Sequence, residues 1–456
     1  MSWMVPLIVC AHIARADELA IPFEQYTLDN GLSVILAPDD STPIVSVNVW
    51  YHVGSKDETE GLSGFAHLFE HLMFQGSTSL PVDFFKPIEA VGGSINGSTN
   101  LDRTNYHETL PAQYLPLALF AESDRMGWLI IDEDRLANQK EVVRNERRQN
   151  YEIKPYGSWR LDLYAALYPK GHPYHHITIG SHQDLENATL EDVKGFFDAW
   201  YVPNNASLVI AGDLDIEATK ALVAEYFGNI PAGAPIERAT PPPHALTNTT
   251  TIRQTADVPE QRVWIAWHSP AHFAPGDAEL DLLATALSTG KNSRLYQRLV
   301  QTGIAKSVGA NQRSQLLTSV FIIDATAAPG HDTDEIVSII DEVLAEIMSD
   351  KPPTADELAG ARAGIERSLY ERLRTVQSKA DNLNRFLMSP DGLNGLLNYS
   401  ARYAEQTPEQ IVAASASLFT EQRVVLHIQP ERGADNRAEG FWKKLFKKPK
   451  SEGESG

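Results

Sequence analysis

The sequence contains almost no cysteine. A single thiol, that of Cys10, occurs in 456 residues. One thiol cannot form a disulfide framework or a cysteine-ligated zinc site, so both kinds of stabilised domain are excluded. Any metal ion that this chain binds must therefore be held by histidine, aspartate or glutamate side chains.

Positive charge is also scarce. Lysine and arginine number 39 against 60 acidic residues, which gives a formal net charge of −21. A nucleic-acid-binding protein would carry a basic face or stripe, so we expect no nucleic-acid partner. Hydrophobic residues make up 43% of the chain, and this composition is typical of a packed globular protein.

Long hydrophobic runs are missing as well. Apart from the N-terminus, no stretch approaches the roughly 20 apolar residues that a membrane-spanning helix requires. The segment from Trp3 to Ala14 is mostly apolar, and Ala14-Arg15-Ala16 resembles an export cleavage site, although a basic segment does not precede it. We therefore interpret residues 1–16 as a bacterial export signal and expect a periplasmic or secreted protein.

The order of elements repeats along the chain. Residues 24–53 alternate in the manner of strands, with a hairpin signal at Asn30-Gly31. The further elements predicted before residue 231 are helices at 61–75, 81–91, 111–127, 133–151 and 189–201, a strand pair at 93–110 and a strand at 206–211. After a proline-rich stretch, the second series comprises strands at 263–267, 320–325 and 424–428 and helices at 278–287, 293–300, 333–348 and 355–373.

This repetition predicts an α+β protein built as a tandem duplication, with mixed or antiparallel sheets covered by helices. We expect a first domain at 17–230, a proline-rich linker at 231–247 and a homologous second domain at 248–432. The basic tail at 433–456 contains Trp442, Leu445 and Phe446 at helical spacing with lysines opposite. It is most simply a solvated disordered tail, and the alternative is contact with an anionic membrane surface.

The chemistry-bearing motif is His67-Leu68-Phe69-Glu70-His71. On a helix, the two histidines lie one turn apart on the same face and can reach one zinc ion. Glu70 lies near that face and can act as the base toward a zinc-activated water. The alternative, a core helix that holds two histidines by chance, must bury a charged glutamate at considerable cost.

A catalytic zinc ion also requires a third protein ligand. The predicted helix at 133–151 offers Glu133, Glu141 and Glu146. Glu141 and Glu146 are rotated by about 140° on an ideal helix, so both cannot point into one site. Glu146 can point toward the buried side, although neighbouring arginines leave a solvated salt-bridge face as the alternative for either acid. A second histidine cluster, at 172, 175 and 176, lies in a predicted loop and is expected to be at the surface or behind the site.

The motif sits in a stretch that resembles a known family. Residues 61–77 read GLSGFAHLFEHLMFQGS and are similar to the pitrilysin-type M16 zinc peptidases, in particular the bacterial processing-peptidase-like branch. Further similar segments are Gly92-Gly93-Ser-Ile-Asn96, the run from Val142 to Arg148, His172-Pro173-Tyr174, and Tyr201-x-Pro203-Asn-Asn-Ala206 leading into Gly212-Asp213. The resemblance extends over residues 24–430.

The resemblance implies a zinc-dependent endopeptidase or oligopeptidase that hydrolyses unfolded peptides. It implies His67, His71 and Glu146 as zinc ligands and Glu70 as the catalytic base. It implies that a substrate peptide adds as a strand beside Asn96, Gly97, Ser98 and Thr99. It also implies a clam-shell chamber formed by two such chains.

Two positions depart from the family pattern. Many relatives carry an acid where this chain has Gln139, and active members place a tyrosine, seven residues after an arginine, where it has Lys306. The second domain also lacks the zinc motif. We therefore predict that this chain is the zinc-bearing subunit of a heterodimer with a homologous zinc-less partner. The alternatives are a self-sufficient homodimeric peptidase and a non-catalytic structural core-type subunit.

Overall fold

The computed structural model of the chain describes residues 21–238, 241 and 244–431. The expected export signal at 1–16, Cys10 and the basic tail at 433–456 therefore lie outside the described residues. Within them, no helix combines the length and the apolar character needed to cross a membrane.

The first sheet has six strands. In spatial order they are β1 (Glu24–Thr27), β2 (Ser33–Pro38), β6 (Ala206–Gly212), β3 (Ile44–Tyr51), β5 (Thr104–Pro111) and β4 (Ser94–Thr99). Strands β2 and β6 are parallel, and every other pair of neighbours is antiparallel. Because β4 is last in this order, one of its backbone edges is left without a strand neighbour in the described chain.

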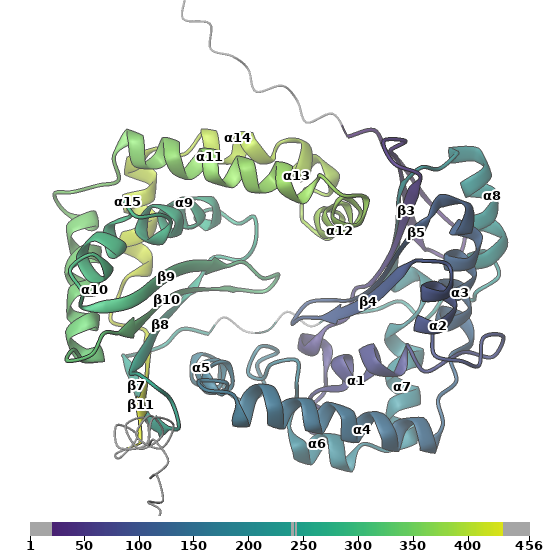
Figure 1. The fold of residues 1–456 in the computed structure, drawn as a ribbon, viewed down its shortest axis with the longest axis horizontal. Coiled ribbons are helices and arrows are strands. Elements are labelled where there is room, and N and C mark those ends of the chain that lie inside the picture. The colour runs from purple at the N-terminus through teal and green to yellow at the C-terminus, as the bar shows by residue number, and fades with distance from the viewer. Residues whose placement is uncertain (1–20, 239–240, 242–243, 432–456) are drawn as a thin grey trace, which may run out of the picture.

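The second sheet repeats this plan with five strands. In spatial order they are β7 (Thr250–Ala256), β11 (Val424–Pro430), β8 (Arg262–Ser269), β10 (Ser319–Ala327) and β9 (Ala305–Arg313). Strands β7 and β11 are the parallel pair, and they occupy the places of β2 and β6. The predicted α+β fold with two similar halves is therefore confirmed, and Figure 1 shows the two sheets on opposite sides of the molecule.

Helices cover both sheets. In the first half they are α1 (Phe65–Leu72), α2 (Phe85–Ala90), α3 (Leu115–Trp128), α4 (Glu133–Arg147), α5 (Trp159–Leu167), α6 (His182–Asn187), α7 (Leu190–Trp200) and α8 (Ile216–Phe227). In the second half they are α9 (Asp277–Ser288), α10 (Thr333–Met348), α11 (Ala355–Arg372), α12 (Val376–Leu387), α13 (Leu393–Leu397), α14 (Tyr399–Ala404) and α15 (Pro408–Leu418).

The two halves exchange one helix each. Helix α12 of the second half packs against β3 and β6 of the first sheet, where the Asn384 amide donates to the carbonyl oxygen of Asn48 at 3.0 Å. Helix α5 of the first half packs against β8 and β11, and Trp159 stacks on Trp264 with ring centroids 5.6 Å apart. Since strand residues alternate between faces, each sheet contributes to two cores, and each core draws residues from both halves.

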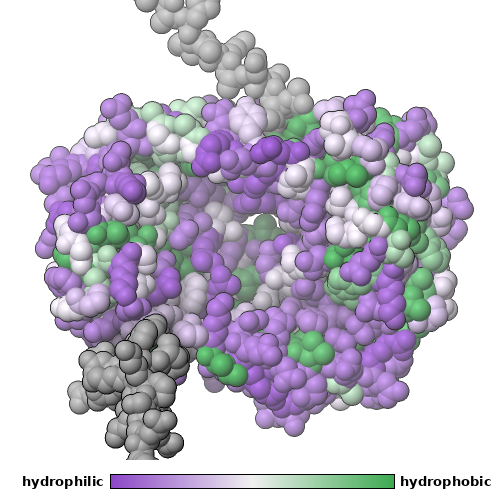
Figure 2. All heavy atoms as spheres, in the orientation of Figure 1, coloured by the Kyte–Doolittle hydropathy of each residue, from purple (hydrophilic) through white to green (hydrophobic). Residues whose placement is uncertain are grey.

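A hollow lies between the halves. Figure 2 shows it at the centre of the visible face, bordered mainly by hydrophilic residues. The edge strand β4 points toward the middle of the molecule, with α1 and α4 beneath it in the view of Figure 1. The fold therefore sets the edge of one sheet and two helices beside a space that a flexible chain could enter.

The structure differs locally from the sequence prediction. The helix expected at 293–300 is present as a short helical segment at 294–300, of which Tyr296–Val300 is π-helical. Strand β9 was not predicted, because its sequence AKSVGANQR is largely polar and its burial follows no strict alternation. The helix predicted at 133–151 is present, but only Glu133–Arg147 is α-helical (α4), and it continues directly as a π-helical segment over Arg148–Ile153.

Candidate metal centre

Helix α1 carries the sequence motif and is preceded by Gly64, whose φ of 95° is a left-handed conformation that glycine adopts most easily. One face of the helix is fully buried and includes Leu68, Phe69 and Leu72. The opposite face carries the two histidines of the motif, His67 and His71. Their rings lie 4.9 Å apart, with side chains only 13% and 23% exposed. The hydrophobic side of the motif thus fixes the helix and leaves the imidazoles facing the site.

Glu146 on α4 completes a cluster with these histidines. Its Oε2 atom lies 3.6 Å from Nε2 of His67 and 3.5 Å from Nε2 of His71. These three form the one group of potential metal-binding side chains that meets within 4.8 Å among the described residues. Zinc held tetrahedrally at about 2.1 Å from each donor requires donors about 3.4 Å apart, and a catalytic site has three protein ligands. The donor set and its spacing therefore fit zinc.

The electrostatics of the cluster favour metal binding. Burial, with a further contribution from nearby His71, lowers the pKa of His67 to about 4, so its ring is neutral at physiological pH. The hydrogen bond with His71 lowers the pKa of Glu146 more than burial raises it, so its carboxyl is ionised. A neutral imidazole and a carboxylate are the protonation states that coordinate a cation.

Glu70 lies beside the three clustered residues and is not one of them. Its Oε2 accepts a hydrogen bond from the Thr99 hydroxyl at 2.7 Å. Burial raises the pKa of Glu70, although the Thr99 hydrogen bond opposes this. A Cβ atom on Gly97 would approach Cγ of Glu70 to 3.2 Å, so the β4 backbone lies directly against this carboxylate. The edge strand β4 and the Glu70 carboxylate are therefore adjacent.

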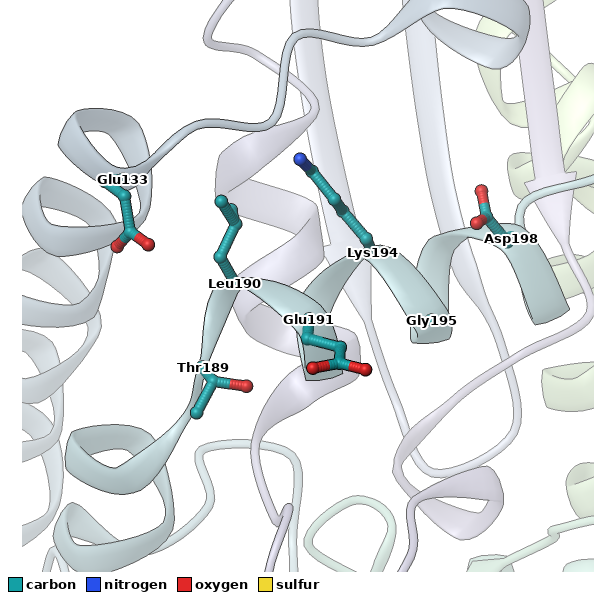
Figure 3. Close-up of a pocket in the computed structure, with 7 residues that line it drawn as sticks. All are labelled: Glu133, Thr189, Leu190, Glu191, Lys194, Gly195 and Asp198. Atoms are coloured by element: carbon teal, nitrogen blue, oxygen red, sulfur yellow. The ribbon is translucent and has the colours of Figure 1, made fainter.

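The other acids of α4 do not join the cluster. The Glu141 side chain is 56% exposed and pairs with Arg144 at 2.6 Å. Glu133 lines an open surface pocket of about 690 Å³ together with residues of α7. Figure 3 shows Glu133 on the side opposite Lys194 and Asp198. Of the three acids that the sequence leaves open, the structure brings Glu146 alone to the histidines.

The four predicted substrate-binding residues, Asn96 to Thr99, lie in β4 at the open edge of the first sheet. Thr99 contacts Glu70, a link that the sequence prediction did not include. The Arg103 guanidinium donates to the carbonyl oxygen of Ser98 at 2.6 Å, which holds the end of the strand in place. The residues next to the metal cluster are thus themselves fixed by side-chain hydrogen bonds.

The second histidine cluster is expected at the surface or behind the site. His172 is buried, 8% exposed, and stacks on Tyr168 with ring centroids 4.5 Å apart, so it does not lie at the surface. His175 contacts the carbonyl oxygen of Tyr168 through Nδ1 at 2.7 Å. His176 contacts Glu58 at 2.7 Å, and Glu58 is a residue that sequence reasoning missed. The two residues are 118 positions apart, so no local pattern could connect them.

Comparison with known proteins identifies the family. The family model described as "Insulinase (Peptidase family M16)" matches residues 33–176. A second model, described as "Peptidase M16 inactive domain", matches residues 187–365. The chain belongs to peptidase family M16. The first M16 match contains the whole α1 motif and Glu146, and the second contains α9.

Individual M16 relatives align over most of the chain. The zinc protease PqqE of Helicobacter pylori is 28% identical over 435 residues, covering 93% of this chain and 97% of that protein. The "Probable mitochondrial-processing peptidase subunit beta, mitochondrial" of Arabidopsis thaliana is 24% identical, covering 83% of this chain and 72% of that protein. A solved protease from Helicobacter pylori superposes with a TM-score of 0.83 at 27% identity, covering 90% of this chain and all of that one.

The second half of this M16 chain shows why it cannot hold the same metal. Helix α9 corresponds to α1, because both follow a left-handed glycine, Gly276 with φ 98° and Gly64 with φ 95°. Counting from these glycines, Glu279 stands in the place of His67 and the buried Leu283 in the place of His71. The Glu279 carboxylate accepts a hydrogen bond from the Gly276 amide and so caps its own helix.

The residues around the missing tyrosine are engaged elsewhere. Lys306 on β9 forms an ion pair with Glu260. Arg298 pairs with two acids of α10, Glu342 at 2.7 Å and Glu346 at 3.1 Å. Each cation therefore has a carboxylate partner within its own half of the M16 chain.

Proposed function

We propose that this chain is a zinc-dependent endopeptidase or oligopeptidase that hydrolyses unfolded peptides. The observation that supports this best is the convergence of His67, His71 and Glu146 from two helices at the spacing that zinc requires. A carboxylate base, Glu70, stands beside them, and an open strand edge adjoins that base.

Each residue of the site would have a separate role in peptide hydrolysis. His67, His71 and Glu146 would hold the zinc ion, which when bound lowers the pKa of a water molecule and polarises the scissile carbonyl group. Glu70 accepts the proton that the attacking water releases and can return it to the leaving amine. Thr99 orients the Glu70 carboxylate through its 2.7 Å hydrogen bond.

We place the substrate along β4. The backbone of Asn96, Gly97, Ser98 and Thr99 can hydrogen-bond an extended peptide as an added strand. Such pairing depends on backbone hydrogen bonds and not on side chains. Peptides of many sequences can therefore bind, but only in an extended conformation. Because Gly97 lies against Glu70, a peptide paired here passes next to the base.

Metal analysis tests this proposal. The purified protein should contain about one zinc ion per chain, and a chelator should abolish cleavage of a fluorogenic peptide. Glu146→Gln should weaken zinc binding, whereas Glu141→Gln, on the same helix but 56% exposed, should leave it unchanged. A protein that binds no zinc, or a zinc affinity that depends on Glu141 and not on Glu146, would refute the assignment.

We further propose that the active form is a heterodimer. In this chain Lys306 and Arg298 are paired with carboxylates, which supports a homologous zinc-less partner as the source of an arginine and tyrosine that stabilise the developing oxyanion. A self-sufficient homodimer is the alternative. The assay compares the chain alone with the chain plus such a partner; full activity alone, with no gain from the partner, would exclude the heterodimer.

We propose a periplasmic or secreted location from the pattern of residues 1–16. Cell fractionation with an antibody to the chain tests this, and N-terminal sequencing of the recovered protein should begin near Asp17. Recovery of the protein in the cytoplasm with these residues retained would contradict the proposal.

A further inference from the structure

The N-terminus of α1 is held by a carboxylate from outside the helix. The Glu58 side chain is fully buried, and its two oxygens accept hydrogen bonds at 2.8 Å from the backbone amides of Gly64 and Ala66. The first amides of a helix have no partner within the helix, so an external acceptor that is also negatively charged stabilises this end. Glu58 therefore fixes the first turn of the helix that carries the histidines.

His176 in turn holds Glu58. Its Nε2 lies 2.7 Å from Oε2 of Glu58, the oxygen that also accepts from Gly64. Burial raises the pKa of Glu58. Burial also opposes the charged form of His176, but the hydrogen bond and negative charge of Glu58 outweigh it, so the pKa of His176 is raised. The contact is thus a short hydrogen bond between an imidazole and a carboxyl group, and the Glu58 side chain in it is fully buried.

The segment that bears His176 also contacts both helices of the metal cluster. The Asp184 carboxylate accepts from the Ser63 amide at 3.0 Å, just before α1. A Cβ atom on Gly180 would lie 2.2 Å from the Ser63 carbonyl oxygen, so the two backbones are in direct contact. The Arg147 guanidinium, next to Glu146 on α4, donates to the carbonyl oxygen of Gly180.

We propose that His176 is a positioning residue of the metal centre, which acts through Glu58 to hold α1 at the place where its histidines meet Glu146. This inference rests on the proposed function, because it concerns the same zinc site. His176 does not touch the cluster itself. It belongs to the segment from 172 to 184, which joins the start of α1 to the end of α4, and the geometry between those helices sets the separation of the three donors.

Loss of His176 should change zinc affinity and turnover by a measurable factor. Tetrahedral zinc tolerates little error in donor spacing, and outer partners of metal ligands usually change metal affinity or activity by about 10- to 100-fold when they are removed. Substrate binding should change less, because β4 does not contact this segment through any hydrogen bond among the described residues. Loss of His176 should therefore lower zinc affinity and kcat while KM stays close to that of the unaltered chain.

The experiment compares three variants of the full chain. His176→Leu removes the donor, His176→Gln keeps an N–H group at similar reach, and His331→Leu is the matched control. His331 also contacts a carboxylate, that of Glu335 at 2.8 Å, but it is at the surface of the second half. Zinc affinity is measured by competition with a chelating dye, and kcat and KM are measured with a peptide at saturating zinc.

We expect zinc affinity and kcat to fall by about 10-fold or more in His176→Leu, to recover to within about threefold in His176→Gln, and to stay unchanged in His331→Leu. A folded His176→Leu protein with unaltered affinity and kcat would overturn the inference, as would equal damage in the leucine and glutamine variants. If the unaltered chain binds no zinc, the proposed function fails, and this is a separate outcome.

If His176→Leu does not fold, a double-mutant cycle decides. Glu58→Gln, His176→Ala, which removes the donor with a smaller side chain, and the double variant are compared by zinc affinity. Losses that are clearly less than additive support a shared action of the two residues on α1. Additive losses would show that they act independently and would refute the proposal.

Discussion

Replacing Glu70 by glutamine tests its role as a base separately from metal binding. The two side chains have the same shape, and the amide oxygen of glutamine can still accept the hydrogen bond that Thr99 makes at 2.7 Å. Glu70 lies outside the cluster of His67, His71 and Glu146, so zinc binding should be retained. What is lost is the ability to accept a proton, because an amide is not a base at neutral pH.

The expected size of the effect follows from the role of a general base. Such groups typically contribute about 10²- to 10⁴-fold to the rate, which corresponds to about 3–5 kcal/mol of transition-state stabilisation. We therefore expect kcat of Glu70→Gln to fall by at least about 100-fold, with KM nearly unchanged because peptide pairing along β4 is not altered.

The assay follows cleavage of a quenched fluorescent peptide over a range of concentrations, with zinc content measured on the same samples. Glu141→Gln is the matched control, since its carboxylate is exposed and pairs with Arg144. A Glu70→Gln protein that keeps one zinc per chain and retains more than about a fifth of the activity would refute the assignment of Glu70. Loss of zinc from this variant would show instead that Glu70 is needed for metal binding.

Three further outcomes are expected. Arg125→Met should destabilise the fold by about 3–5 kcal/mol in chemical denaturation, because the fully buried Glu108 and Glu122 carboxylates would lose their shared cation; a loss below about 1 kcal/mol would contradict this. Burial, reinforced by the charge of Asp277, raises the pKa of Asp281 from 3.8 to about 7, so its favourable contribution is complete below about pH 4 and is lost as the pH rises toward 7. Asp281→Asn should therefore flatten the fall of stability between these pH values and be the more stable protein at pH 8, as measured by urea unfolding; an unchanged slope would argue against this pKa. Finally, an unfolded polypeptide should be cleaved while the same sequence in a compact native domain is spared, and rapid digestion of the native domain would exclude selection of extended chains by β4.

The local part of the metal centre was predictable from sequence, and the long-range part was not. His67, Glu70 and His71 lie within one helical turn, so their common face follows from helix geometry alone. Glu146 is one of three acids on one predicted helix; helix periodicity separates it from Glu141, and the family resemblance, not the residue pattern, assigns it as the ligand. The packing of α4 against α1 is what brings it to the histidines. His176 belongs to a histidine cluster expected at the surface or behind the site, but Glu58 had no signal, and no local pattern links two residues 118 positions apart.

The same distinction holds for the fold. Helices with strong periodicity were placed well: α10 was predicted and found at 333–348. Strands β7 and β9 were missed because their sequences, TTIRQTA and AKSVGANQR, are polar and lie at sheet edges, where half of each strand faces away from the core. Nothing in the apolar face of α12 indicates which sheet it covers, because the face is the same whichever half it packs against.

The exchange of α5 and α12 makes the duplicated chain one cooperative body. Severing it within 231–247 would not release two autonomous modules. The upstream fragment would present the β-sheet residues Ile35, Val209 and Ala211 without the helix that shields them, and the downstream fragment would present Trp264 in the same way. Each isolated fragment would expose apolar surface and would tend to aggregate. Mixing the two fragments would restore both hydrophobic cores.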